Sequence, residues 1–332
     1  MKSSKKIVVI GSNSFSGSDF VDLLLEKGGG QVIGISRSPE KSETYLPYKK
    51  RTGADFKFYQ MDLNQDMDRL LDFLDSFAPE FIVNFATQSE VAPSWENPEH
   101  WFQTNGVALS RLVNHLRRKP YLKRYVHIST PEVYGNSKGL LGDDTPLRPS
   151  TPYAVSRAAQ DMLFGIYKER FGFPVVTVRS ANVYGAHQQL WKIIPRSVLY
   201  IKLGKKIPLQ GGGIARRSFI HVRDVSEGEL AVMEGGQTGA IYHFSTENAQ
   251  SIREVVGLVC ERMGTTLEKA AEDVGDRPGQ DSAYLLDTGR SRRELGWKPR
   301  VLLDQGIGEV VRWIDSRWNE IRKEPMEYAH RP

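Results

Sequence analysis

The chain has 332 residues, of which 39% are hydrophobic and 26% are charged, and this composition is typical of a globular protein with one large or two modest domains. The chain has 45 lysine and arginine residues and 40 aspartate and glutamate residues, which gives a net charge of +5. The two kinds are interspersed, so the sequence contains no basic block that would indicate nucleic-acid binding. A single cysteine, Cys260, excludes an internal disulfide and a thiolate metal cluster, and the histidines have no metal-ligand spacing.

The N-terminal sequence MKSSKKIVVIGSNSFSG lacks the apolar segment and the small-residue cleavage site of a signal peptide. No apolar stretch reaches the length of a membrane span. We therefore expect a cytoplasmic protein with neither a membrane nor a nucleic-acid partner.

Short apolar runs alternate with amphipathic stretches through the first half of the chain. The runs predicted to form buried strands are, in chain order, KIVVIG, VIGIS, FKFYQMD, FIVNFA, RYVHIST and VVTVRS. Helices are predicted between them, for example over residues 17–27, 99–118 and 153–170. This alternation predicts an α/β fold, a doubly wound parallel sheet of the Rossmann type with helices on both faces.

The strand and helix rhythm changes after about residue 180. Pro195, Pro208 and the run Gly211–Gly213 interrupt it, and two further strands are predicted at RSFIHV and AIYHFS. The predicted division is a dinucleotide-binding domain over residues 1–180 with returning segments at 214–246, and a smaller mixed α/β substrate lobe over 181–213 and 247–325. The last residues, EYAHRP, are expected to be disordered.

A glycine-rich turn, GSNSFSG, joins the first predicted strand to the first helix. Such a turn lets backbone N–H groups and the helix N-terminus face the pyrophosphate of a dinucleotide. Serine stands at position 14, where the common pattern has its middle glycine. The pattern alone also fits a capped turn without a ligand, but its position between a β-branched strand and an amphipathic helix favours a cofactor site. The candidates from this turn are Gly11, Ser14, Phe15 and Gly17.

The end of the second predicted strand carries an arginine, Arg37, between two serines. Dinucleotide-binding folds place an acidic residue there for the ribose of NAD, whereas an arginine accommodates the 2'-phosphate of NADP. Arg37 therefore favours NADP over NAD, although a solvated loop arginine gives the same pattern. The remaining cofactor-binding candidates follow the third and fourth strands and are Asp62, Leu63, Phe85 and Ala86.

Four polar side chains are predicted to meet at the carboxyl edge of the sheet. Thr130 and Glu132 belong to STPEVYG, which directly follows the strand RYVHIS, and ligands bind at this edge in doubly wound folds. Tyr153 and Arg157 are one helical turn apart in TPYAVSR, and a cation beside a phenol favours the phenolate. Together they form a candidate set for proton transfer above a nicotinamide ring.

Several segments together carry a family resemblance that spans nearly the whole chain. They are GSNSFSG, NFATQSEVAPSWENPEHWFQTN, STPEVYG, TPYAVSRAAQD, RSANVYG, RRSFIHVRDV, GDRPGQD and ELGWKP. With these segments in this order, the sequence resembles the extended short-chain dehydrogenase/reductases that modify nucleotide sugars. It is most similar in pattern to the nucleotide-hexose 4,6-dehydratases that act on dTDP-glucose and GDP-mannose.

The resemblance implies a role for each residue at the reacting centre. Tyr153 would remove the proton of the sugar 4-hydroxyl while hydride passes to the nicotinamide, and Thr130 would hydrogen-bond the same oxygen. Glu132 would remove the proton at carbon 5 before water leaves carbon 6. Tyr153 and Arg157 would also lie beside the nicotinamide ribose.

Two positions depart from the family pattern. Proline occupies position 131, where the dTDP-glucose enzymes carry an aspartate that protonates the leaving hydroxyl. The similar GDP-mannose dehydratases have serine there, keep the glutamate and use NADP. Arg157 replaces the lysine of the Y-x-x-x-K motif, and it is longer, planar and permanently charged.

The resemblance also implies a substrate, a nucleotide-diphosphate hexose, and a homodimer formed through helices 99–118 and 153–170. The residues implied near the diphosphate are Asn182, Arg217 and Arg277. Those expected to face the hexose are Gln88, Ser89, Glu90 and Trp95.

Three alternatives to a dehydratase remain open from the sequence. A 4-epimerase needs Thr130 and Tyr153 but no carboxylate at position 132. A uronic-acid decarboxylase keeps a similar T-x-E-V-Y-G pattern and needs a cation near the sugar carboxylate. A dinucleotide-binding sensor without turnover would tolerate Pro131 and Arg157 but has no use for the remaining polar set.

Overall fold

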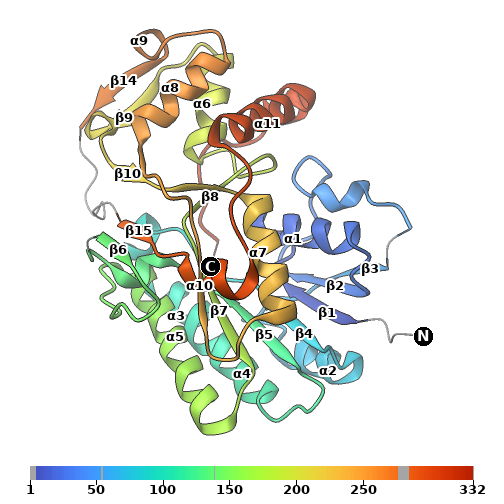
Figure 1. The fold of residues 1–332 in the computed structure, drawn as a ribbon. Helices are drawn as coiled ribbons and strands as arrows, with labels where there is room; N and C mark the ends of the chain where they lie inside the picture. The colour runs from blue at the N-terminus through green and yellow to red at the C-terminus, as the bar shows by residue number, and fades with distance from the viewer. Residues whose placement is uncertain (1–4, 54, 138, 276–283, 332) are drawn as a thin grey trace.

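The computed structural model describes residues 5–53, 55–137, 139–275 and 284–331 (Figure 1). Its centre is a parallel sheet of seven strands in the order β12-β7-β5-β4-β1-β2-β3. The strands are β1 (Lys6–Ile10), β2 (Gln31–Ser36), β3 (Phe56–Gln60), β4 (Phe81–Asn84), β5 (Arg124–Ile128), β7 (Val175–Ser180) and β12 (Ile241–Phe244). The order reverses between β1 and its two neighbours, so a crevice opens beyond the carboxyl ends of these strands. The predicted doubly wound Rossmann fold is confirmed.

Helices cover both faces of this sheet. They are α1 (Phe15–Glu26), α2 (Met67–Phe77), α3 (Pro98–Phe102), α4 (Leu109–Leu116), α5 (Pro152–Phe171) and α7 (Val222–Gly235). Phe20 and Val225 represent the apolar cluster under α1 and α7, whereas Leu70, Leu112 and Phe164 represent the cluster under α2, α4 and α5. The inner strands are rich in Val and Ile because they are buried on both faces, whereas the edge strand β3 is only partly buried and contains neither residue.

The predicted helix over residues 99–118 contains a π-helical turn, η3 (Gln103–Ala108), between α3 and α4. Such turns insert one extra residue per turn and often occur at functional sites. Here the turn carries Asn105, whose fully buried amide hydrogen-bonds the backbone and side chains of the loop after β4. The π turn therefore fixes the loop that begins the predicted hexose site.

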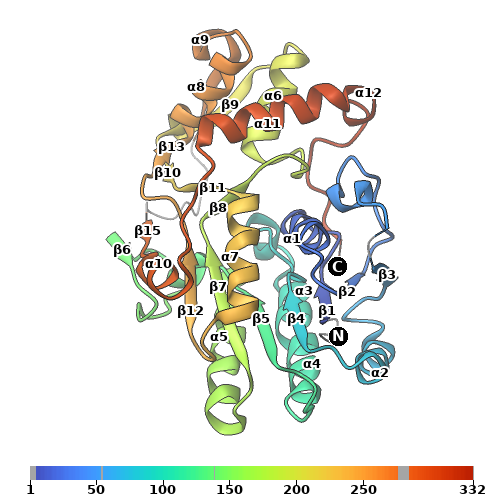
Figure 2. The same cartoon turned by 45° about the vertical axis from the view of Figure 1, so that its right-hand side comes forward.

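The later elements form a group with a core of its own. Figures 1 and 2 show α6, α8 and α11 together at one end of the molecule, away from α4 and α5. Their apolar positions Val198, Val259 and Val310 are fully buried in one cluster. This separate core agrees with a second, smaller lobe. The residue boundaries predicted for the two domains stay a prediction. The bounds of this group are α6 (Ile193–Lys202), β9 (Ile207–Gln210), α8 (Ile252–Arg262), α9 (Leu267–Ala270), β14 (Ala271–Val274), α11 (Leu303–Ser316) and α12 (Trp318–Ile321).

Only one of the two late strands returns to the main sheet. AIYHFS forms β12 and extends the sheet beside β7, as predicted. RSFIHV forms β11 (Phe219–His221), which pairs instead with β8 (Asn182–Tyr184) in a separate two-stranded sheet. The run is a strand, as predicted, but its expected return to the main sheet was wrong, because its partner β8 follows the end of β7 and α7 begins directly at Val222. The remaining short elements are η1 (Pro47–Lys50), η2 (Ala92–Trp95), η4 (Pro131–Tyr134), β6 (Gly139–Leu141), β10 (Arg216–Arg217), η5 (Gly211–Gly213), β13 (Gln250–Ser251), β15 (Tyr284–Leu286) and α10 (Gly289–Leu295).

Candidate functional site

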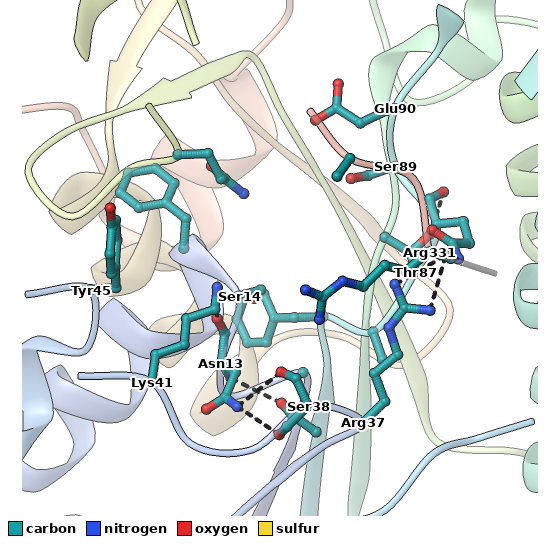
Figure 3. A pocket seen from close by; sticks show the side chains of 18 of the residues that line it. Asn13, Ser14, Arg37, Ser38, Lys41, Tyr45, Thr87, Ser89, Glu90 and Arg331 are labelled. Atoms are coloured by element: carbon teal, nitrogen blue, oxygen red, sulfur yellow. Dashed lines mark hydrogen bonds between the residues drawn. The ribbon is translucent and has the colours of Figure 1, made fainter. Parts of the chain in front are cut away.

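A cleft of about 720 Å³ opens where the chain leaves β1, β2, β3 and β4 (Figure 3). Its walls include most of the residues predicted to bind a cofactor, together with three predicted to face the hexose. These residues are Gly11, Ser14, Phe15, Arg37, Asp62, Leu63, Phe85, Ala86, Gln88, Ser89 and Glu90. The structure thus brings together candidates that lie up to 79 positions apart in the sequence, from residue 11 to residue 90.

The glycine turn depends on two glycines at which no side chain can be accommodated. Gly11 has φ +88°, and a Cβ on it would lie 2.7 Å from the amide nitrogen of Ala86. A Cβ on Gly17 would collide with the carbonyl oxygen of Gly11. Both glycines are therefore required by the fold of the turn, and Ser14 and Phe15 place the N-terminus of α1 at the cleft wall.

Ser14 contributes to this turn as a helix cap. Its hydroxyl accepts a hydrogen bond from the amide of Gly17 at 3.1 Å, and its own amide donates to the carbonyl oxygen of Gly11 at 2.9 Å. Asn13, beside it, was not predicted from the sequence. Its side-chain amide donates to the backbone oxygens of Ser38 and Pro39, so it ties the glycine turn to the loop after β2.

The loops after β2 and β3 form the opposite wall of the cleft. The guanidinium of Arg37 donates from both terminal nitrogens to the backbone oxygen of Arg331, each at 3.2 Å. Asp62 accepts the amide of Asn64 at 2.7 Å, so its carboxylate stabilises the turn after β3. Arg37 thus stands at the predicted ribose position, with its guanidinium inside the cleft.

The C-terminal residues were predicted to be disordered, and this prediction was wrong for the described part, Glu327–Arg331. The ring of His330 stacks on Trp101, with centroids 5.0 Å apart and planes 13° apart, and forms a hydrogen bond of 2.8 Å with His100. The backbone oxygen of Arg331 accepts the side-chain amide of Gln88 at 2.7 Å. Nothing in the local sequence indicates this docking, because Gln88, His100 and Trp101 all lie more than 200 positions earlier in the chain.

The predicted reacting centre forms at the end of β5. Thr130 caps the short helix η4 by accepting the amide of Glu132 at 3.3 Å, and its hydroxyl hydrogen-bonds Tyr153, which lies in the first turn of α5. Burial raises the pKa of the Tyr153 phenol to about 12; the charge of Arg157 and the bond from Thr130 oppose this, and the charge of Glu132 adds to it. Thr130, Glu132 and Arg157 thus all influence the pKa of the Tyr153 phenol, while their catalytic roles stay a prediction. Because this pKa lies far above neutral pH, Tyr153 is a neutral phenol when no ligand is bound.

Arg157 is almost completely buried, with 2% of its surface exposed. One terminal nitrogen donates to the backbone oxygen of Ile128, the last residue of β5. Neither Tyr153 nor Arg157 is among the residues that line the 720 Å³ cleft. Arg157 therefore acts on Tyr153 through its charge, from a position fixed against the sheet.

A buried polar network lies beneath the reacting centre, and the sequence did not indicate it. Asp161 accepts hydrogen bonds from Ser129 at 2.8 Å, from Arg179 at 2.7 Å and from His127 at 3.1 Å. Burial alone would raise the pKa of Asp161, but Arg179 and His127 bring it well below its usual range. Burial also lowers the pKa of His127 to about 4, so the imidazole is neutral. The network holds Ser129, next to Thr130, at the end of the strand.

The predicted substrate residues are more dispersed. Asn182 is exposed at the start of β8 and Arg217 lies in β10, and neither lines the cleft. Arg277 lies outside the described residues. Trp95 is 59% exposed and also lies outside the cleft wall.

Glu90, in contrast, lines the cleft. It accepts Nε1 of Trp191 at 3.2 Å and pairs with Lys192 at 2.8 Å, which joins the loop after β4 to the later elements.

Within the described ranges, no group of three or more histidine, cysteine, aspartate or glutamate side chains has the arrangement of a metal site. None of the helices in those ranges is both long and apolar enough to cross a membrane. Cys260 is buried in an apolar cluster with Ile207 and Val256.

Comparisons with known proteins agree with this geometry. A model of the family described as GDP-mannose 4,6 dehydratase matches residues 8–310. A dTDP-glucose 4,6-dehydratase from Streptomyces niveus is 32% identical, and the alignment covers 98% of each chain. The crystal structure of a dTDP-glucose 4,6-dehydratase from Streptomyces venezuelae with NAD bound is 31% identical, with a TM-score of 0.87 over 96% of this chain and 99% of that chain. A UDP-glucuronic acid 4-epimerase from Bacillus cereus has the same fold, with 23% identity and a TM-score of 0.86 over 94% of this chain and 99% of that chain.

Proposed function

The chain belongs to the GDP-mannose 4,6 dehydratase family, and from this premise we propose that it is a nucleotide-hexose 4,6-dehydratase that uses a nicotinamide dinucleotide. The observation that carries the proposal is the joint position of Thr130, Glu132 and Tyr153 at the carboxyl end of β5. A hydroxyl, a carboxylate and a phenol are the groups that oxidation at carbon 4 and elimination across carbons 5 and 6 require. The cytoplasmic location stays a prediction.

The dinucleotide would lie in the cleft beside the glycine turn. The glycine turn and the N-terminus of α1, which line the cleft, suit a pyrophosphate, and the relative from S. venezuelae contains NAD. Arg37 adds a cation at the ribose position and favours NADP over NAD. If Arg37 binds a 2'-phosphate, Arg37→Ala weakens NADP binding more than NAD binding in a titration; equal weakening would contradict the preference.

The reaction begins with a proton transfer to Tyr153. A nicotinamide held in the cleft would supply hydride transfer from carbon 4 of the sugar to carbon 6. Tyr153 removes the proton of the 4-hydroxyl, and the hydroxyl of Thr130 hydrogen-bonds the same oxygen. The buried cation of Arg157 lowers the free energy of the phenolate that this step needs.

Glu132 then performs the elimination. The 4-keto group acidifies carbon 5, and the carboxylate of Glu132 takes its proton. Pro131 is buried at the first position of η4 and carries no acidic group, so the proton on Glu132 is the one that leaves with the hydroxide of carbon 6 as water. Carbon 5 finally takes up one proton, which balances the proton lost from the 4-hydroxyl. The net change is the loss of one water, without consumption of the cofactor.

A nucleotide-diphosphate hexose is the proposed substrate. Gln88, Ser89 and Glu90 line the cleft, and Glu90 contacts Trp191 and Lys192 of the later part of the chain. Their polar groups suit the hexose hydroxyls. Asn182, Arg217 and Arg277 are proposed to bind the diphosphate, because cations and amides from the later elements recognise phosphate well. Glu132 favours elimination over 4-epimerisation, which has no use for a carboxylate at this position.

A homodimer is proposed through α3, η3 and α5. Large apolar side chains on these helices are exposed in the single chain: Phe102 (40%), Val107 (59%), Val155 (40%), Met162 (63%) and Ile166 (55%). Exposed apolar patches of this kind mark association sites. Sedimentation should find a dimer for the natural chain and a monomer for Ile166→Glu, and an unchanged mass for the variant would contradict this interface.

Mass spectrometry with a panel of nucleotide hexoses tests the function. We expect one member to lose one water, with NAD or NADP added and recovered unchanged. A change of sugar stereochemistry without a change of mass would instead identify an epimerase. If a panel that covers the common nucleotide hexoses remains unaltered while the dinucleotide binds, the sensor alternative replaces the proposal.

A further inference from the structure

Three cationic side chains from distant parts of the chain converge on the cofactor cleft. Figure 3 shows Arg37, Lys41 and Arg331 around the same space, with Arg331 reaching in from the C-terminal segment. Burial lowers the pKa of the Lys41 ammonium, and the nearby charge of Arg331 lowers it further. Like charges brought together in a partly buried cleft are unfavourable unless an anion joins them.

Lys41 places this positive charge beside the glycine turn. Its ammonium donates to the backbone oxygen of Asn13 at 3.1 Å, and Asn13 lies between Gly11 and the start of α1. The N-terminus of α1 contributes the positive end of the helix dipole from the other side. The two cations and the helix N-terminus therefore enclose the part of the cleft where a dinucleotide carries its pyrophosphate.

The backbone around Arg331 is held in place by contacts that do not use its guanidinium. Its backbone oxygen accepts hydrogen bonds from Arg37 and Gln88, and the preceding His330 stacks on Trp101. Tyr328 packs edge-on against Trp191, with ring centroids 5.6 Å apart. The segment is thus anchored on both sides of the cleft, and the side chain of Arg331 is presented to it.

We propose that Arg331 and Lys41 bind the pyrophosphate of the dinucleotide opposite the glycine turn, so that the C-terminal segment is a wall of the cofactor site. The identity of the ligand rests on the function proposed above. A guanidinium and an ammonium form charge-assisted hydrogen bonds with phosphate oxygens, which are stronger than neutral ones. The site differs from that of Arg37, because the pyrophosphate is common to NAD and NADP whereas the 2'-phosphate is not.

Equilibrium titrations without sugar test this proposal. Arg331→Ala is expected to weaken NAD, NADP and ADP by roughly tenfold or more, while adenosine, which has no phosphate, binds as it does to the natural chain. Arg331→Lys should recover most of the affinity. Arg322→Ala removes an exposed arginine of the same terminal region outside the cleft wall and should change nothing. Lys41→Gln should reproduce the loss, and unchanged thermal unfolding of each variant shows that folding is intact.

An increase in NAD affinity in the Arg331→Ala variant would indicate a different role for the C-terminal segment. If the C-terminal segment obstructs the cleft instead of completing it, Arg331→Ala binds NAD more tightly than the natural chain, and the proposal is overturned. Unchanged NAD and ADP affinities overturn it equally. The water-loss assay separates this proposal from the proposed function: dehydration with cofactor affinity independent of Arg331 rejects only the inference. Arg331-dependent binding without dehydration of any sugar supports the inference and rejects only the function.

Discussion

The cofactor cleft and the reacting centre lie at the same edge of one sheet but are built in opposite ways. The cleft is open, and the glycine turn lines it with Gly11, Asn13 and Ser14. The reacting centre is closed: Tyr153 and Arg157 expose 6% and 2% of their surface, and the charge of Arg157 acts on the Tyr153 phenol through little water. A binding surface needs access, whereas a proton-transfer centre needs burial that shifts pKa values.

The largest effect is expected at the closed centre. Tyr153→Phe keeps the ring and its packing but removes the hydroxyl that takes the sugar proton, so turnover should fall roughly 10³-fold. Cofactor affinity should change little, because Tyr153 is not part of the cleft wall. Steady-state rates measure the loss of turnover, and a cofactor titration measures the affinity. Full turnover in the variant would show that Tyr153 does not take the sugar proton.

A smaller effect is expected for the second step. Glu132→Gln should lower dehydration roughly 10²-fold while cofactor reduction at carbon 4 continues, because the amide cannot take the proton of carbon 5. In deuterium oxide the natural protein should place deuterium at carbon 5, and the variant should not. Equal incorporation by both would assign the carbon 5 proton to another group.

Substitutions of Arg157 test whether its positive charge is what lowers the pKa of Tyr153. The pKa of Tyr153 is already raised to about 12, and Arg157→Met removes a cation that lowers it. Because the phenolate fraction falls as this pKa rises, the rising limb of the pH–rate profile should move to higher pH. The rate at neutral pH should fall about tenfold for each pH unit by which the limb moves. Arg157→Lys keeps the charge and should leave the limb nearly in place. Identical profiles for the two variants would show that the charge is not what matters.

The smallest effect concerns the network beneath the centre. The pKa of His127 is lowered to about 4 in the folded chain, against about 6.5 when unfolded, so its stabilising effect is complete above pH 6.5 and is lost as the pH falls toward 4. His127→Asn should therefore reduce the free energy of unfolding more at pH 7.5 than at pH 5.5, by about 1 kcal/mol. Urea unfolding at both pH values measures this, and the same loss at both would mean that His127 is not held neutral.

The sequence predicted the repetitive and local features better than the long-range ones. Six runs of the first half and AIYHFS became strands of the main sheet, because short apolar runs mark strands, and in the inner strands these runs are continuous Val and Ile. The meeting of Thr130 and Tyr153 was predicted from the strand that ends before Thr130 and from the helix that begins near Tyr153. The docking of His330 on Trp101 did not, since such a contact depends on surfaces that exist only after folding. The burial that raises the pKa of Tyr153 could not be predicted from the sequence either, because it results from residues that pack around the phenol only in the folded chain.

The most direct measurement follows one hydrogen through the reaction. A nucleotide hexose carrying deuterium at carbon 4 is converted by the protein, and the product is examined by NMR and mass spectrometry. We predict loss of one water and deuterium at carbon 6, because the hydride removed from carbon 4 is returned within the same site. Deuterium retained at carbon 4, or a product without deuterium at carbon 6, would contradict the proposed dehydratase.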